Sequence, residues 1–152
     1  MNLPTSNSLE DTVSKYHRTQ TQYKDRECLV KALNDMGYEH VEVHDDAVQL
    51  GDWHGHTTHY FDPTGDKANI IVRRRFIGGL PNDLGFLWNA ETKSFDSVIS
   101  EYDGNKHNSS WLGRLTAKYA AHRVQKSVKA LGFVNKVAPV RKNGKLILQV
   151  VR

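Results

Sequence analysis

The chain has 152 residues, of which 38% are hydrophobic and 25% are charged, which is ordinary for a globular protein of one domain. Its lone cysteine, Cys28, excludes an internal disulfide and a zinc cluster built from cysteines, and no apolar run is long enough to span a bilayer. The net charge of +4 conceals an asymmetry: residues 1–66 carry five basic and twelve acidic side chains, a net −7, whereas residues 67–152 carry sixteen basic and five acidic ones, a net +11. Such a division either serves binding partners or is neutralised because the two halves interleave in space.

The first residues of the chain carry no clear folding signal. Residues 1–14 are mostly polar and lack the basic start and apolar core of a signal peptide. We therefore expect residues 1–13 to be a disordered lead-in and residues 14–152 to form a single domain.

The acidic half predicts a strand, a helix and two further strands. Residues 16–23 alternate bulky with polar side chains and are rich in Thr and Tyr, which favours a strand. Asp25 is placed to cap a helix with one apolar stripe, and Gly37 is placed to end it. A strand over residues 38–44, a turn at Asp45-Asp46 and a partner strand over residues 48–50 are expected next.

The middle of the chain predicts an irregular segment and then a sheet section. Residues 51–67 carry turn signals and three histidines. The β-branched run at Ile70, Ile71 and Val72 predicts a strand over residues 68–76, followed by a loop over residues 77–83. Residues 84–89 and 94–100 are expected to pair as a hairpin across residues 90–93.

The basic half predicts a long helix and a final hairpin. Ser109 or Ser110 is placed to cap a helix that runs to Leu131, before Gly132. Asn143-Gly144 between two strand-like runs predicts a hairpin of residues 134–140 with residues 146–151. Together these elements predict an α+β fold, a single antiparallel sheet with two helices packed against it, in the order β-α-β(several)-α-β-β.

The long helix carries the clearest functional pattern. Arg114, Lys118, His122 and Lys126 recur every four residues, so they are neighbours along the helix and repel one another. An anionic partner such as phosphate would relieve that repulsion. The alternative is a solvated face, because cations suit the C-terminal end of a helix.

A second cationic group and three aromatic residues complete the predicted anion site. If residues 68–76 form a strand, Arg73 and Arg75 share one face, and the arginine fork suits phosphate. Trp88, Tyr102 and Tyr119 are candidates for stacking a base, with burial in the core as the alternative.

The remaining motifs support no chemistry. His54, His56 and His59 are weak candidates for a zinc site, against exposed loop histidines as the alternative, so we predict no metal and no other cofactor. The glycines lack the spacing of a phosphate-binding loop, and no nucleophile elbow surrounds the serines. We therefore assign no catalytic residue and do not expect an enzyme.

The order of several motifs resembles the hypothetical chloroplast reading frame thirty-five family, a domain of unknown function found in plastids, cyanobacteria and some bacteriophages. The most specific piece is Asp-Leu-Gly-Phe-Leu-Trp-Asn at residues 83–89, and the likeness extends over about residues 14–152. Other matching residues are Leu29, Ala32, Leu33, Gly37, Tyr38, Gly51, Gly55, residues 68–74, Leu112, Leu115, Tyr119, Ala120, Gly132 and Phe133. The loop over residues 76–82 is longer than in the family, which suggests a phage version. The resemblance implies no catalytic residue.

The function predicted from these features is that of a small accessory protein without enzymatic activity. It would bind a polyanion, either nucleic acid or a phosphate-bearing small molecule, through its basic half. The alternative is a protein–protein adaptor, or a self-associating protein, in which an acidic half meets a basic half. We expect no membrane association and a cytoplasmic location, which would be the host cytoplasm for a phage protein or the stroma for a plastid protein.

Overall fold

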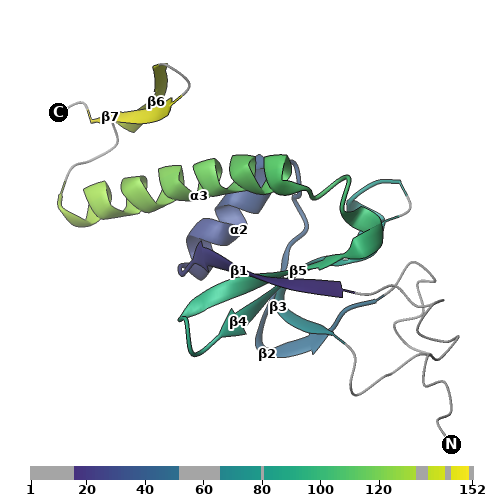
Figure 1. The fold of residues 1–152 in the computed structure, drawn as a ribbon. Helices are drawn as coiled ribbons and strands as arrows, with labels where there is room; N and C mark the ends of the chain where they lie inside the picture. The colour runs from purple at the N-terminus through teal and green to yellow at the C-terminus, as the bar shows by residue number, and fades with distance from the viewer. Residues whose placement is uncertain (1–15, 52–65, 80, 133–136, 143–144, 151–152) are drawn as a thin grey trace, which may run out of the picture.

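The computed structural model describes residues 16–51, 66–79 and 81–132, together with the backbone of residues 137–142 and 145–150. Its main element is a five-stranded sheet in the order β1-β5-β4-β3-β2, with every neighbouring pair antiparallel. The strands are β1 (Tyr16–Tyr23), β2 (Glu42–Gln49), β3 (Lys67–Val72), β4 (Leu84–Asn89) and β5 (Ser94–Ser100). Helices α2 (Arg26–Asp35) and α3 (Ser109–Ala130) lie on one face of this sheet (Figure 1). The predicted α+β class, with two helices on one antiparallel sheet, is confirmed.

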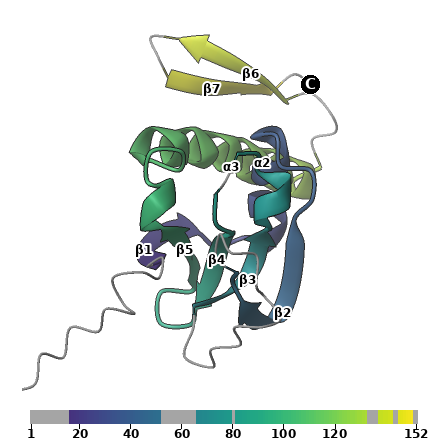
Figure 2. The same ribbon diagram turned by 90° about the vertical axis from the view of Figure 1, so that its right-hand side faces the viewer.

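The last two strands form a sheet of their own. β6 (Val137–Lys142) pairs with β7 (Lys145–Val150) in an antiparallel hairpin. The hairpin lies beyond the helices, on the side of α3 that faces away from the main sheet (Figure 2). The two predicted strands are confirmed with small shifts in their bounds, and the Asn-Gly turn lies outside the described residues.

The ends of both helices follow from local side-chain chemistry. Asp25 caps α2, as predicted, because its Oδ1 accepts a hydrogen bond from Cys28 N at 3.0 Å. Gly37 follows the helix with a φ of 100°, which a glycine adopts without strain. For α3 the predicted serine cap is wrong: the cap is Asn108, whose Oδ1 accepts from Trp111 N at 2.9 Å.

The predicted turn at Asp45-Asp46 is also wrong. β2 continues through both residues, and its register against β3 shifts between Val43 and Val48. The irregularity is held by Asn69, whose Nδ2 donates to the carbonyls of His44 and Asp45 at 3.2 and 3.1 Å. A side chain from the next strand therefore takes the place of ladder bonds, and the chain does not need to reverse.

The strand predicted over residues 68–76 is too long. β3 ends at Val72, and a short 3₁₀ helix, η1 (Arg74–Phe76), follows it. The buried Asp83 accounts for the change of direction, because its Oδ1 accepts from Arg74 N at 2.8 Å. The backbone N–H of Arg74 thus donates to the Asp83 carboxylate, and is not available for the ladder bond that a continuing strand would have formed.

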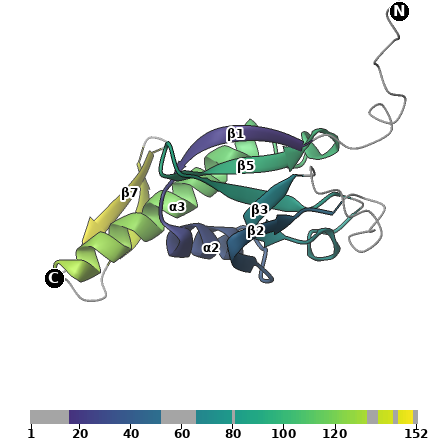
Figure 3. The same cartoon turned by 90° about the horizontal axis from the view of Figure 1, so that it is seen from below.

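The two faces of the sheet bury separate apolar clusters. Helix residues Leu29, Leu33 and Leu115 are fully buried in one cluster with Ile70 and Phe86. The second cluster comprises Leu50, Ala68, Ile71 and Val98, with Leu87 packed against it. Alternate residues of a strand point to opposite faces, so this cluster lies on the face away from the helices. Figure 3 shows β1 and β2 at the two edges of the sheet.

Candidate anion-binding surface

The core-facing side of α3 fixes the orientation of the whole helix. Trp111, Leu115 and Tyr119 recur every four residues, and all three are buried. The Tyr119 hydroxyl accepts from the backbone N–H groups of Lys24 and Asp25 at 2.8 and 2.9 Å, where α2 begins. The structure therefore places Tyr119 in the core with its hydroxyl engaged, which leaves no ring face open to a base.

The second half of the basic row on α3 is used inside the fold. His122 Nε2 lies 2.6 Å from Asp35 Oδ2, at the end of α2. Lys126 Nζ lies 2.7 Å from Asp25 Oδ2 and 3.4 Å from Glu27 Oε2. The acidic and basic halves of the chain thus neutralise each other in part, where the two helices meet.

The environment of Asp25, where α2 meets α3, favours the ionised carboxylate. Burial alone would raise the pKa of Asp25, but hydrogen bonds from Lys126 Nζ and Cys28 N outweigh burial and lower the pKa to about 2. Arg123, which the four-residue spacing does not include, adds a contact from Nη1 to Asp25 Oδ2 at 3.1 Å. The carboxylate that caps α2 is therefore also the anchor of α3.

The first half of the row has no such carboxylate partner among the described residues. Arg114 and Lys118 are exposed, and Arg114 Nη1 donates to Ser110 Oγ, at 3.1 Å, one turn earlier. Lys129, near the end of α3, is exposed as well. Within the part of the chain that the structure describes, none of these three cations has a carboxylate within ion-pair distance.

The arginines after β3 do not form the predicted pair. Arg73 Nε and Nη2 donate to the carboxylate of Glu42 at 2.7 and 3.2 Å, and Nη1 donates to Asp83 Oδ2 at 2.9 Å. Arg75 lies on η1 instead, exposed, with its guanidinium 4.8 Å from the centroid of the Phe76 ring. Because the strand ends at Val72, the expectation that Arg73 and Arg75 share one strand face is wrong. The guanidinium of Arg73 is instead bound by two carboxylates of the same fold, those of Glu42 and Asp83.

The other two aromatic candidates are accessible. Trp88 of β4 is 41% exposed, and Tyr102, in the 3₁₀ helix η2 (Glu101–Asp103), is 62% exposed. Trp88 lines the same pocket as two cations that the sequence analysis did not single out, Lys24 and Arg26. Their sequence signal is weak, because in the tripeptide Lys-Asp-Arg at the start of α2 the capping Asp25 lies between the two basic residues.

The weak metal candidates are not tested by the structure. His54, His56 and His59 lie outside the described residues. Among the residues that are described, no group of three His, Cys, Asp or Glu side chains is arranged to hold a metal ion. In the same described residues, no helix has both the length and the apolar character that crossing a membrane requires.

The fold and this surface define a small α+β protein in which several exposed cations of α3 have no carboxylate partner among the residues that the structure describes. The family described as "Protein of unknown function (DUF1257)" matches residues 32–149. Because the match covers well over half of the chain, the chain belongs to this family. No curated protein and no solved structure matches the chain.

Proposed function

We propose that this protein is a small accessory protein that binds a polyanion, with nucleic acid as the first ligand to test, through the exposed cations of α3. The observation that supports the proposal is the exposure of Arg114, Lys118 and Lys129 without carboxylate partners among the described residues. No acidic residue follows Asp103 in the sequence, so no side chain of α3 offsets the repulsion between these cations. Phosphate groups would do so, and would release counterions as they bound.

The contact set that we propose differs from the one predicted from the sequence. Carboxylates of the same chain lie within ion-pair distance of Arg73, His122 and Lys126, so these residues are already partly neutralised within the fold. We retain Arg114 and Lys118 as the principal contacts and add Lys129. With so few contacts, binding should be of modest affinity and strongly dependent on salt.

The adaptor hypothesis stays a prediction, and we place it second to polyanion binding. It needs the acidic half of the chain to be available to a partner, but Asp25, Glu27 and Asp35 already pair with α3 of the same chain. We further propose that the chain is a member of the hypothetical chloroplast reading frame thirty-five family. A cytoplasmic or stromal location is part of the same proposal.

A charge-neutralising variant tests the proposal. We would measure the binding of a fluorescently labelled oligonucleotide by anisotropy, for the wild type and for Arg114→Gln/Lys118→Gln. Both positions are exposed, so the substitutions should change the free energy of unfolding by less than about 0.5 kcal/mol. The matched control is Lys67→Gln/Lys93→Gln, which removes the same charge from exposed positions outside α3. The proposal predicts weaker binding in the α3 variant alone; equal loss in both variants, or no binding by the wild type, would contradict it.

A further inference from the structure

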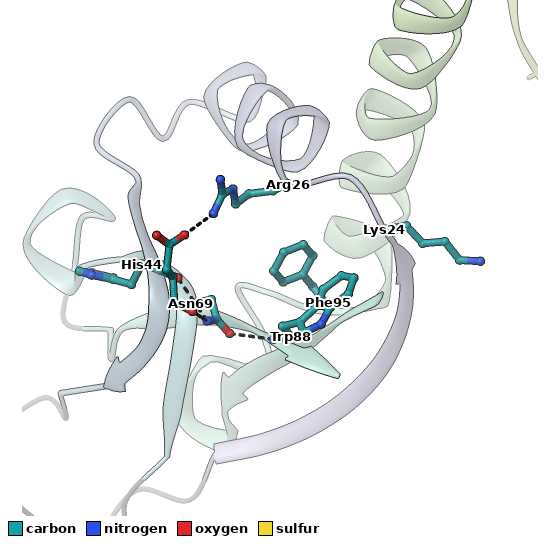
Figure 4. A pocket seen from close by; sticks show the side chains of 7 residues that line it. Lys24, Arg26, His44, Asn69, Trp88 and Phe95 are labelled. Atoms are coloured by element: carbon teal, nitrogen blue, oxygen red, sulfur yellow. Dashed lines mark hydrogen bonds and ion pairs between the residues drawn. The ribbon is translucent and has the colours of Figure 1, made fainter. Parts of the chain in front are cut away.

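A hollow of about 310 Å³ lies between the start of α2 and the strands β2, β3 and β4 (Figure 4). Its lining includes two aromatic rings, two cations and an amide, contributed by Trp88, Phe95, Lys24, Arg26 and Asn69. This volume is at the small end of the range for ligand sites in proteins. It suits a single small ligand built around one aromatic ring system.

The aromatic floor of this pocket is held rigidly. Trp88 and Phe95 are partners across β4 and β5, and their ring centroids lie 5.0 Å apart at an interplanar angle of 67°. Phe95 is 4% exposed, whereas Trp88 is 41% exposed. The buried phenyl ring therefore supports an indole that still has open surface, which is the arrangement used for stacking a planar ligand.

Asn69 holds the backbone of Trp88 and uses both of its Nδ2 hydrogens within the sheet. Its Oδ1 accepts from Trp88 N at 2.9 Å, while its Nδ2 donates to the carbonyls of His44 and Asp45. The His44 ring points away from the two aromatic rings in Figure 4, and its Nε2 lies 2.8 Å from Glu42 Oε1. The amide donors of Asn69 and the Nε2 atom of His44 are therefore already engaged within the fold, so the pocket should discriminate weakly between bases.

The rim of the pocket is positively charged. Arg26 Nη1 lies 2.9 Å from Asp45 Oδ1, and both side chains are mainly exposed, so a stronger anion can replace Asp45 at little cost. The Lys24 ammonium has no ion-pair partner among the described residues and extends away from the rings in Figure 4. Its flexible stem allows the charge to turn back over the rim. Two cations and one carboxylate leave a net positive rim beside an aromatic floor.

We propose that this pocket binds an aromatic ring that carries a phosphate, of the size of a nucleoside monophosphate. The ring stacks on Trp88, and the phosphate replaces Asp45 as the partner of Arg26, with Lys24 as a second contact. This site is separate from the polyanion surface on α3, and its ligand is either a free nucleotide or the terminal nucleotide of a single strand. Because stacking provides the ring contact, purines should bind somewhat more tightly than pyrimidines.

Calorimetric titration of the full-length protein with adenosine monophosphate tests the site. Trp88→Ala should weaken binding about tenfold or more, since base stacking on one aromatic ring accounts for that range. Trp88→Phe should restore part of the loss. Arg26→Gln should weaken the phosphate contact, so that the preference for adenosine monophosphate over adenosine is smaller in the variant than in the wild type, with Lys24 still present. Lys31→Gln, an exposed cation of the same helix outside the pocket lining, is the matched control and should leave the affinity unchanged.

The outcomes separate this site from the α3 surface. Adenosine monophosphate binding that survives Arg114→Gln/Lys118→Gln but is lost in Trp88→Ala supports the pocket whatever happens to oligonucleotide binding. If only a short oligonucleotide shows the dependence on Trp88, the ligand is a strand end and the site still stands. Absence of a Trp88 effect on both ligands, or equal effects of Arg26→Gln and Lys31→Gln, would overturn the proposal.

Discussion

Lowering the pH from 7 to 5 should destabilise this protein through one buried histidine. His107 is 3% exposed, its Nε2 lies 2.9 Å from the Tyr38 hydroxyl, and its ring packs against Trp111 with centroids 4.6 Å apart. Its Nδ1 is buried and has no hydrogen-bond partner among the described residues, so a proton added there would have no acceptor. Burial, together with the charge of the neighbouring Lys106, lowers the pKa of His107 from 6.5 to about 4.

The sign and size of the effect follow from this depressed pKa. Well above pH 6.5 His107 is neutral in both the folded and the unfolded chain, so it makes no difference to stability. Between pH 6.5 and about 4 the unfolded chain binds a proton that the folded chain excludes, so stability falls as the pH falls. From pH 7 to pH 5 a single group of this kind reduces the free energy of unfolding by about 2 kcal/mol.

Urea unfolding at the two pH values, for the wild type and for His107→Gln, measures this contribution. The variant keeps a polar side chain near Tyr38 but cannot titrate, so its loss of stability between pH 7 and pH 5 should be about 2 kcal/mol smaller than that of the wild type. His17→Gln, at an exposed position of β1, is the control and should retain the wild-type difference. Identical pH dependence in the wild type and in His107→Gln would refute the reasoning.

Two further substitutions test the packing of the sheet. A Cβ added at Gly85 would lie 2.7 Å from the Cβ of Ala68, so Gly85→Ala should destabilise the protein by about 1–3 kcal/mol in thermal unfolding. Gly113→Ala is the control, because a Cβ added there on α3 meets open space and should not destabilise the protein. Similar melting temperatures for the two variants would contradict this expectation. Asp83→Ala removes the carboxylate that accepts from the largely buried Arg73 and from two backbone N–H groups, and it should cost about 3–5 kcal/mol in urea unfolding. A loss below about 1 kcal/mol would show that water replaces Asp83.

The elements that the sequence predicts well are those whose signals are local. The bounds of β1, β4 and β5 match the predictions, because alternation of side chains and a short turn decide them within a few residues. The cap at Asp25 is equally local, since its carboxylate reaches only three residues along the chain.

The elements that the sequence predicts poorly depend on distant side chains. The continuation of β2 depends on Asn69, whose partners lie 25 and 24 residues away, and the end of β3 depends on Asp83, which accepts from Arg74 nine residues away. The basic row on α3 shows the same limit for the site. Its periodicity is visible in the sequence, but the carboxylates that engage His122 and Lys126 lie 87 and 101 residues away, at the end and at the N-cap of α2.

The salt dependence of oligonucleotide binding tests the central claim most directly. If Arg114, Lys118 and Lys129 each neutralise one phosphate, a plot of log affinity against log salt for a single strand should have a slope of about −2, a loss of about 20-fold between 50 and 200 mM salt. The Arg114→Gln/Lys118→Gln variant should retain a slope of about −0.7. A flat response in the wild type, or the same slope in the wild type and the variant, would show that these cations only face solvent.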